Sequence, residues 1–253
     1  MRKLVVILIL LVLLISFGIK EVYAGEVSLG IEKWRGHTSY KISGTNQNGD
    51  WKSILEFPLN TEFLQINYTD DIENFAILNS FSISYKRNIF KDSGVFKDSD
   101  WFFGSEQKLI YAETKSRLNA DIFNFEVKRL TNQIFNNVNL SSLMGYTYQK
   151  FNFIAKDGWQ KSYLNDPPTT QEIEEEAIEY DITYKIPYIG IAIFNKPNKE
   201  INYMIKGDFI PRFWTRDHDY HIVRDKNAYS YVNGMGVGFS PKINYELNMK
   251  FYY

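Results

Sequence analysis

The chain contains no cysteine and only three histidines among its 253 residues. Without cysteine, disulfide bonds, thiolate metal sites and cysteine nucleophiles are excluded. The formal net charge of -1 lacks the basic excess that favours binding to nucleic acid, so nucleic acid is not an expected partner. After residue 24, no apolar run approaches the roughly 20 residues that a membrane-spanning helix needs.

The N-terminal 24 residues differ from the rest of the chain. Arg2 and Lys3 precede a nearly unbroken apolar run from Leu4 to Phe17, and Val22-Tyr23-Ala24 then precedes Gly25. A charged region, an apolar region and small residues in this order are typical of a secretory signal peptide. An uncleaved anchor is the alternative, but the run is shorter than a spanning helix. We expect a signal peptide over 1–24 and one domain over 25–253.

Aromatic residues are abundant, at 17% of the chain, with 18 Tyr and 19 Phe. In a transmembrane β-barrel an apolar lipid face alternates with a polar interior, and aromatic girdles mark both rims. An exported chain of this composition therefore favours a barrel in the outer membrane.

Period-two alternation of apolar and polar residues predicts strands along most of the chain. Over 243–253 one parity is wholly apolar, and Ser240-Pro241-Lys242 just before it predicts a turn. The pattern as a whole predicts strands near 26–44, 51–68, 74–89, 107–128, 136–156, 174–195, 201–216, 226–240 and 243–253.

From Ile110 to Ile122 the even positions are mostly apolar, whereas the odd positions read Tyr111, Glu113, Lys115, Arg117, Asn119 and Asp121. Hydrocarbon offers charged groups neither water nor partners, so we expect this row to face a polar lumen. Alternation alone also fits a soluble β-sandwich. The predicted strands, however, exceed the usual 3–10 residues of globular sheets. The fold expected is all-β, a transmembrane antiparallel β-barrel of about 8–10 strands with extended extracellular loops.

Two acidic clusters follow predicted strands and are therefore expected in loops. Asp98 and Asp100 follow the third strand, and Asp217, Asp219 and His221 follow the seventh. If the first strand runs outward, the third and seventh also do, so both clusters lie at the extracellular rim. Residues two apart in an extended backbone point to the same side. The clusters can then face each other across the barrel mouth.

Such a constellation could hydrolyse a peptide bond with water as the nucleophile. His221 would be the general base, Asp219 would orient it, and Asp98 with Asp100 would hold the water and share protons. This chemistry needs neither a metal nor a covalent intermediate. A solvated turn and a cation site with Asp and His ligands are alternative interpretations of the same spacing.

At these residues the sequence resembles the omptins, a family of outer-membrane endopeptidases. The likeness covers nearly all of the mature chain in the family's order, and it rests on Ser28-Leu29-Gly30, Asp98-Ser99-Asp100-Trp101, Gly145-Tyr146 with Phe153, Pro187-Tyr188-Ile189-Gly190 and Asp217-His218-Asp219-Tyr220-His221. The resemblance implies a ten-stranded barrel whose extracellular mouth holds an Asp-Asp pair opposite an Asp-His dyad. It assigns the pair to Asp98 and Asp100 and the dyad to Asp219 and His221.

The resemblance also implies a preference for cleavage next to basic residues and activation by lipopolysaccharide. Asp217 matches one acidic substrate-binding position, but Tyr40 stands where the family has a Glu on the first strand. Lys150 matches one lipid-binding cation, whereas Tyr148 and Thr183 occupy other such positions and cannot replace a bidentate cation on phosphate. We therefore expect a changed basic preference and weakened lipid binding.

By the same resemblance, residues 226–240 match the eighth strand and 243–253 the ninth, an odd count that conflicts with the even number of strands usual in bacterial barrels. The function expected is an endopeptidase of the outer membrane with its site facing the exterior, peptides or surface proteins as substrates and no metal. A catalytically inactive barrel, acting as an adhesin or a structural or porin-like protein, is the alternative. A lipid-modifying enzyme ranks last, because no Ser-His constellation supports it.

Overall fold

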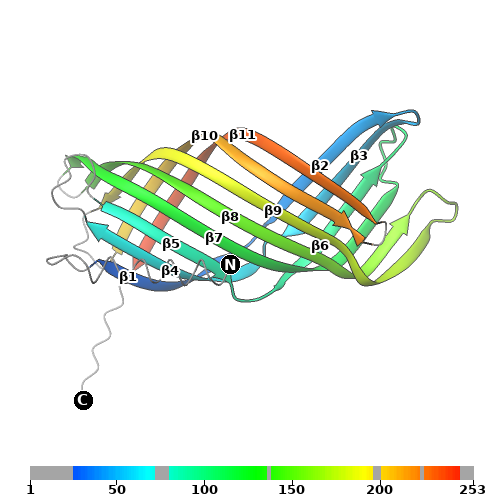
Figure 1. The fold of residues 1–253 in the computed structure, drawn as a ribbon, viewed down its shortest axis with the longest axis horizontal. Helices are drawn as coiled ribbons and strands as arrows, with labels where there is room; N and C mark the ends of the chain where they lie inside the picture. The colour runs from blue at the N-terminus through cyan, green and yellow to red at the C-terminus, as the bar shows by residue number, and fades with distance from the viewer. Residues whose placement is uncertain (1–24, 72–79, 136–137, 196–200, 223–224, 246–253) are drawn as a thin grey trace, which may run out of the picture.

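The structure is a computed structural model that describes residues 25–71, 80–135, 138–195, 201–222 and 225–245 (Figure 1). The predicted signal peptide lies outside these residues. No helix in the described residues is long and apolar enough to cross a membrane. The strands are β1 (Glu26–Trp34), β2 (His37–Asn46), β3 (Gly49–Pro58), β4 (Thr61–Asp71), β5 (Ser80–Asn88), β6 (Asp92–Trp101), β7 (Ile110–Phe135), β8 (Val138–Ser162), β9 (Thr169–Asn195), β10 (Ile201–His221) and β11 (Lys226–Tyr245).

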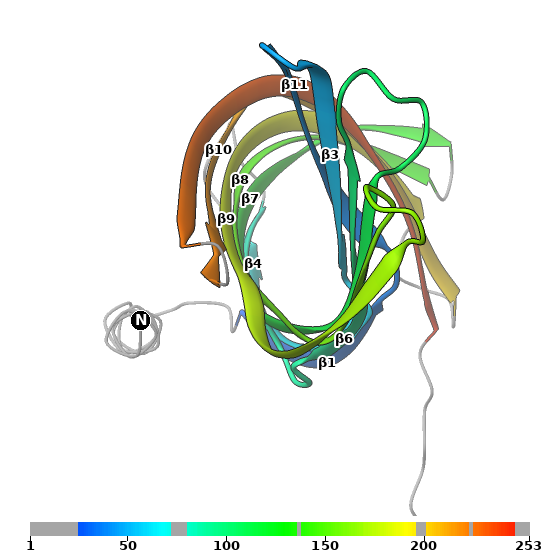
Figure 2. The ribbon, with the colours of Figure 1, turned by 90° about the vertical axis from the view of Figure 1, so that its right-hand side faces the viewer.

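All strands belong to one antiparallel sheet that makes eight passages along the molecule. Three passages are interrupted and consist of two consecutive strands each: β1 with β2, β3 with β4, and β5 with β6. The long strand β7 pairs with both β5 and β6. The strands curve round one axis (Figure 2). The predicted antiparallel barrel is confirmed, although β1 and β11 are not paired with each other in the described residues, so the sheet is not closed.

The C-terminal part departs from the prediction of two short strands. β11 runs without a turn from Lys226 to Tyr245, and Pro241 lies opposite Ile205 of β10 within the ladder. The predicted turn at Ser240-Pro241-Lys242 is therefore wrong, and the remainder of the predicted last strand lies outside the described residues. An edge strand tolerates proline because its missing N–H costs no ladder hydrogen bond on the unpaired side.

Apolar side chains cover the outer face of the sheet, as a lipid-facing surface requires. On β11 the exposed row includes Met235, Val237 and Phe239, and on β1 it includes Val27 and Leu29. The alternation of β11 thus places its apolar parity outward.

The charged row of β7 also faces outward, which contradicts the prediction that it lines a lumen. Lys115 and Arg117 are exposed, whereas Leu118 and Ala120 of the other parity are buried in the barrel interior. β7 has 26 residues, far more than the 9–11 that cross a membrane. The half of β7 that begins at Ile110 can therefore extend beyond the lipid, where an outward charge meets water and an inward apolar residue forms a core.

The interior at this level is filled by a cluster that we call the aromatic core. Phe57 of β3 is its centre, with ring centroids 4.7 Å from Phe96, 4.9 Å from Phe153 and 4.5 Å from Tyr180. These rings come from β3, β6, β8 and β9, and all four are buried. The aromatic core therefore holds opposite parts of the wall together.

A second interior layer is polar. The Lys206 Nζ of β10 lies 2.6 Å from Glu126 Oε2 of β7 and 3.3 Å from Asp208 Oδ2. Tyr188 of β9 donates a hydrogen bond of 3.0 Å to the same Glu126 oxygen. Charges buried together in this way need partners, and here each has at least one.

Replacing Phe57 by Ala should lower the free energy of unfolding by about 3–5 kcal/mol, the usual cost of truncating a buried aromatic side chain. Phe239→Ala is the matched control, because that ring is 73% exposed on the outer face. Denaturant titration of the two variants in the same detergent measures the difference. Equal losses would contradict the position of Phe57 at the centre of the core.

Candidate active site

The Asp219 and His221 side chains lie on the inward face of β10 because of a β-bulge. The register of β10 shifts between Ile210 and Phe213. Before the bulge the even residues Lys206 and Asp208 point inward, and after it the odd residues do. A bulge adds one residue to one strand and so changes the face on which later side chains lie.

His221 and Asp219 form a hydrogen-bonded pair. The His221 Nε2 lies 3.2 Å from Asp219 Oδ2, and Asp219 is only 3% exposed. The other carboxylate oxygen, Oδ1, is buried and has no hydrogen-bond partner in the described part of the chain. If Nε2–H donates to Asp219, Nδ1 carries the lone pair that can accept a proton.

Asp98 and Asp100 lie within β6 and not in a loop, and the second cluster likewise lies within β10. The prediction of loops is wrong because both strands extend farther than their apolar alternation. Asp98 and Asp100 are buried, and they share one face of β6. Ser53 of the neighbouring β3 donates a hydrogen bond of 3.5 Å to Asp98 Oδ1.

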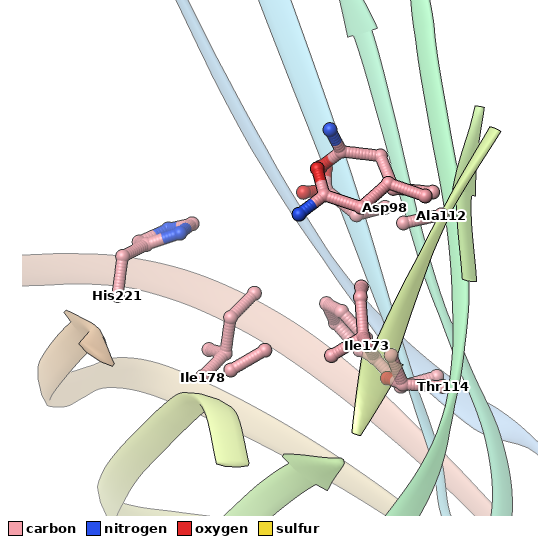
Figure 3. A pocket seen from close by; sticks show the side chains of 10 residues that line it. Asp98, Ala112, Thr114, Ile173, Ile178 and His221 are labelled. Atoms are coloured by element: carbon pink, nitrogen blue, oxygen red, sulfur yellow. The ribbon is translucent and has the colours of Figure 1, made fainter. Parts of the chain in front are cut away.

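One pocket brings the two clusters together. Asp98 and His221 both line it, and its volume is about 180 Å³. Figure 3 shows the two side chains on different walls, with Ile173, Ile178 and Thr114 below them in the view. Asp100 and Asp219 lie two residues away on the same strands and do not line the pocket. Phe96 connects the pocket to the aromatic core beneath it.

Asp217 lies two residues before Asp219 and is held by a separate group of hydrogen bonds. Its Oδ1 accepts from the Ser230 Oγ at 2.6 Å and the Ser230 N–H at 3.2 Å, and its Oδ2 accepts from the Tyr180 hydroxyl at 3.4 Å. The Tyr40 hydroxyl donates to Ser230 at 3.4 Å. Sequence reasoning missed Ser230 and the hydroxyl of Tyr180. Ser230 lies opposite Asp217 on β11 and Tyr180 lies opposite Asp219 on β9, so only the strand pairing could have indicated them.

The remaining predicted residues lie on the outside or near the rim. Lys150 of β8 lies between Asp121 of β7 and Thr183 of β9, on the outer face of the wall. The acidic run at Glu172 and Glu174–Glu176 belongs to β9, where all four side chains are exposed. No group of three or more His, Asp or Glu side chains in the described ranges is arranged to hold a metal ion.

The fold and these two facing clusters define a β-barrel of the outer-membrane type with a polar site near one end. The profile of the omptin family matches residues 27–252, and the chain belongs to that family. Among solved structures, it is similar to the outer membrane protease OmpT from Escherichia coli, with a TM-score of 0.52 and 13% sequence identity over 89% of this chain and 99% of that chain. No curated protein matches the sequence.

Replacing Ser230 by Ala should destabilise the protein by about 1–3 kcal/mol, because it leaves one oxygen of the buried Asp217 carboxylate short of a donor. Ser240→Ala on the exposed part of the same strand is the control and should have little effect. Denaturant titration again measures the change. A neutral Ser230→Ala variant would show that the hydrogen bond does not hold Asp217.

Proposed function

We propose that the protein is an endopeptidase that cleaves peptides or proteins by means of a water molecule activated between Asp98 and His221. The observation that carries this proposal is the pocket that both side chains line. Membership of the omptin family supports an outer-membrane protease. The similar barrel of the outer membrane protease OmpT supports the same conclusion at the level of the fold.

The proposed reaction uses His221 as the general base. The imidazole takes a proton from water while the water oxygen attacks the carbonyl carbon of the scissile peptide bond. Asp219 orients the ring and stabilises its positive charge, and Asp98 with Asp100 holds the water and shares protons. The imidazolium then gives its proton to the leaving nitrogen as the carbon–nitrogen bond breaks. No metal and no acyl-enzyme take part in this scheme.

The site would face the cell exterior. With β1 starting at the periplasmic side, β6 and β10 end at the outer side, together with the pocket between them. Peptides and surface proteins would then reach it without crossing the membrane. The exposed carboxylates of Glu172 and Glu174–Glu176 on β9 would attract cationic segments of such substrates.

Asp217 and Tyr40 would form the subsite for a basic side chain. Asp217, which is hydrogen bonded to Ser230, supplies a negative charge. Tyr40 supplies a hydroxyl and a ring face that can contact a cation. Only one carboxylate takes part, and it is already hydrogen bonded. The preference for Arg or Lys at this subsite is therefore expected to be modest.

A lipopolysaccharide phosphate is the proposed ligand of Lys150. The ammonium group acts as a point charge, and the neighbouring Thr183 of β9 adds no second cation. We therefore expect weak activation by lipopolysaccharide. An inactive barrel serving as an adhesin or porin-like protein is the competing function, but the buried rings of the aromatic core fill the interior at the level of Phe57 and favour the enzyme over a pore.

Replacing His221 by Ala should reduce kcat for a basic peptide by about 10²–10⁴-fold, which is the usual contribution of a general base. His218→Ala is the control. His218 lies on the other face of β10, stacked on Tyr229 at 4.3 Å and hydrogen bonded to Asn227. The kcat values of the purified, folded variants test this role. An undiminished kcat of the His221→Ala variant would exclude His221 as the general base.

Replacing Tyr40 by Glu should raise the selectivity for Arg over Leu at the adjacent substrate position. A second carboxylate beside Asp217 would add about 1 kcal/mol of ion pairing at a partly exposed site, or roughly fivefold in kcat/KM. Tyr40→Phe serves as the control, since it removes the hydroxyl without adding charge. Identical selectivity in all three proteins would place the basic subsite elsewhere.

A further inference from the structure

The pocket beside Asp98 and His221 continues away from them toward a wall formed by β7, β8 and β9. This wall consists of uncharged side chains, namely Ala112, Thr114, Gln160, Gln171, Ile173 and Ile178. Asp98 and His221 are the only ionisable groups that line the pocket in the described part of the chain. The chemistry of this pocket therefore differs from that of the subsite proposed at Asp217.

The register of the strands shows that this wall is continuous. Ala112 of β7 lies opposite Gln160 of β8, and Gln160 lies opposite Gln171 of β9. The small Ala112 leaves room at one end of this row, and the two amides follow it. Thr114 lies two residues after Ala112 on the same face of β7, and Ile173 lies two residues after Gln171 on the same face of β9.

Thr114 supplies an independent indication that the pocket binds a ligand. Its Oγ1 is buried and has no hydrogen-bond partner in the described residues, although the pocket lies directly beside it. An unpaired buried hydroxyl is unfavourable, and a polar group of a ligand could satisfy it. Two further buried oxygens without a partner in the described residues, Ser116 Oγ and Asp219 Oδ1, lie two residues from Thr114 and His221 but do not line the pocket.

We infer that this pocket is a specificity subsite for an uncharged side chain of the substrate residue next to the scissile bond. The inference rests on the proposed function, because Asp98 and His221 at the pocket's edge position the scissile bond. A volume of about 180 Å³ equals the liquid volume of about six water molecules, enough for one side chain of the size of Leu, Met or Gln. A charged side chain would lose its hydration there without gaining a partner on this wall, and Asp98, the one carboxylate that lines the pocket, holds the attacking water in the proposed reaction.

The subsite is distinct from the one proposed at Asp217. Ser230 and Tyr40, which adjoin Asp217, belong to β11 and β2. The pocket wall belongs to β7, β8 and β9, on the other side of β10. Successive side chains of an extended peptide point in opposite directions. One substrate residue can thus occupy the Asp217 subsite while its neighbour across the scissile bond occupies the pocket.

The test is cleavage of peptides that keep one Arg beside the scissile bond and vary the residue on its other side. Leu, Met or Gln should give a kcat/KM at least tenfold above Ala, because each methylene lost from an apolar pocket costs about tenfold or more. Lys and Glu should be at least tenfold poorer than Leu. Equal rates for Ala, Leu and Lys would overturn the inference while leaving the proposed endopeptidase intact.

Two variants locate the preference in this pocket. Gln171→Glu adds a carboxylate to the wall and should raise the rate for Lys several-fold relative to Leu. Thr170→Glu adds the same charge to the opposite face of β9, at a residue that is also exposed, and should not change this ratio. The same ratio in both variants would overturn the inference.

Binding separates this inference from the proposed function. The dissociation constants of the same peptides on the His221→Ala protein, measured by fluorescence anisotropy, should still favour Leu over Lys. If wild-type protein binds with this order but cleaves none of the peptides, the endopeptidase is refuted and the pocket stands only as a binding site for an uncharged side chain. Equal dissociation constants for the Ala, Leu and Lys peptides would refute the subsite.

Discussion

The stack of Phe57 on Tyr180, with 4.5 Å between ring centroids, connects the two parts of the barrel interior on which the site depends. The stack belongs to the aromatic core, and the hydroxyl of Tyr180 donates from it to the Asp217 carboxylate. A carboxylate buried at this depth needs donors, because its desolvation would otherwise be costly. Tyr180 therefore packs as an apolar ring and acts as a polar partner at once, which fixes β9 and β10 at the level where the catalytic candidates lie.

Period-two alternation predicted strands well but could not decide which face of a strand looks inward. In β11 the apolar parity faces outward with Val237 and Phe239, whereas in the first half of β7 it faces inward with Leu118 and Ala120. Lipid and a protein core both select apolar side chains, so the pattern is the same in both. The deciding quantity is the height of a residue relative to the membrane, which depends on strand length and register, and neither follows from local sequence.

The candidate residues were recognisable in the sequence as short polar clusters, and the family resemblance placed them in order. Their setting was not predictable. The bulge between Ile210 and Phe213 determines that Asp219 and His221 point inward, and the alternation of the sequence did not indicate this change of face. Gln171 comes from a strand remote in sequence, and Ser230 faces Asp217 because of the pairing of β10 with β11, so the register of the sheet brings both to the site.

In the proposed reaction, Asp98 and His221 act on one water molecule as a unit. A double-mutant cycle tests it most directly, because groups that act together in catalysis show strongly non-additive losses. Rates of the Asp98→Ala, His221→Ala and double variants, all verified as folded, complete the cycle. If the two side chains act as a unit, the double variant should be about as slow as the slower single variant. Losses in kcat that multiply would show that the two side chains act independently and would contradict the proposed reaction.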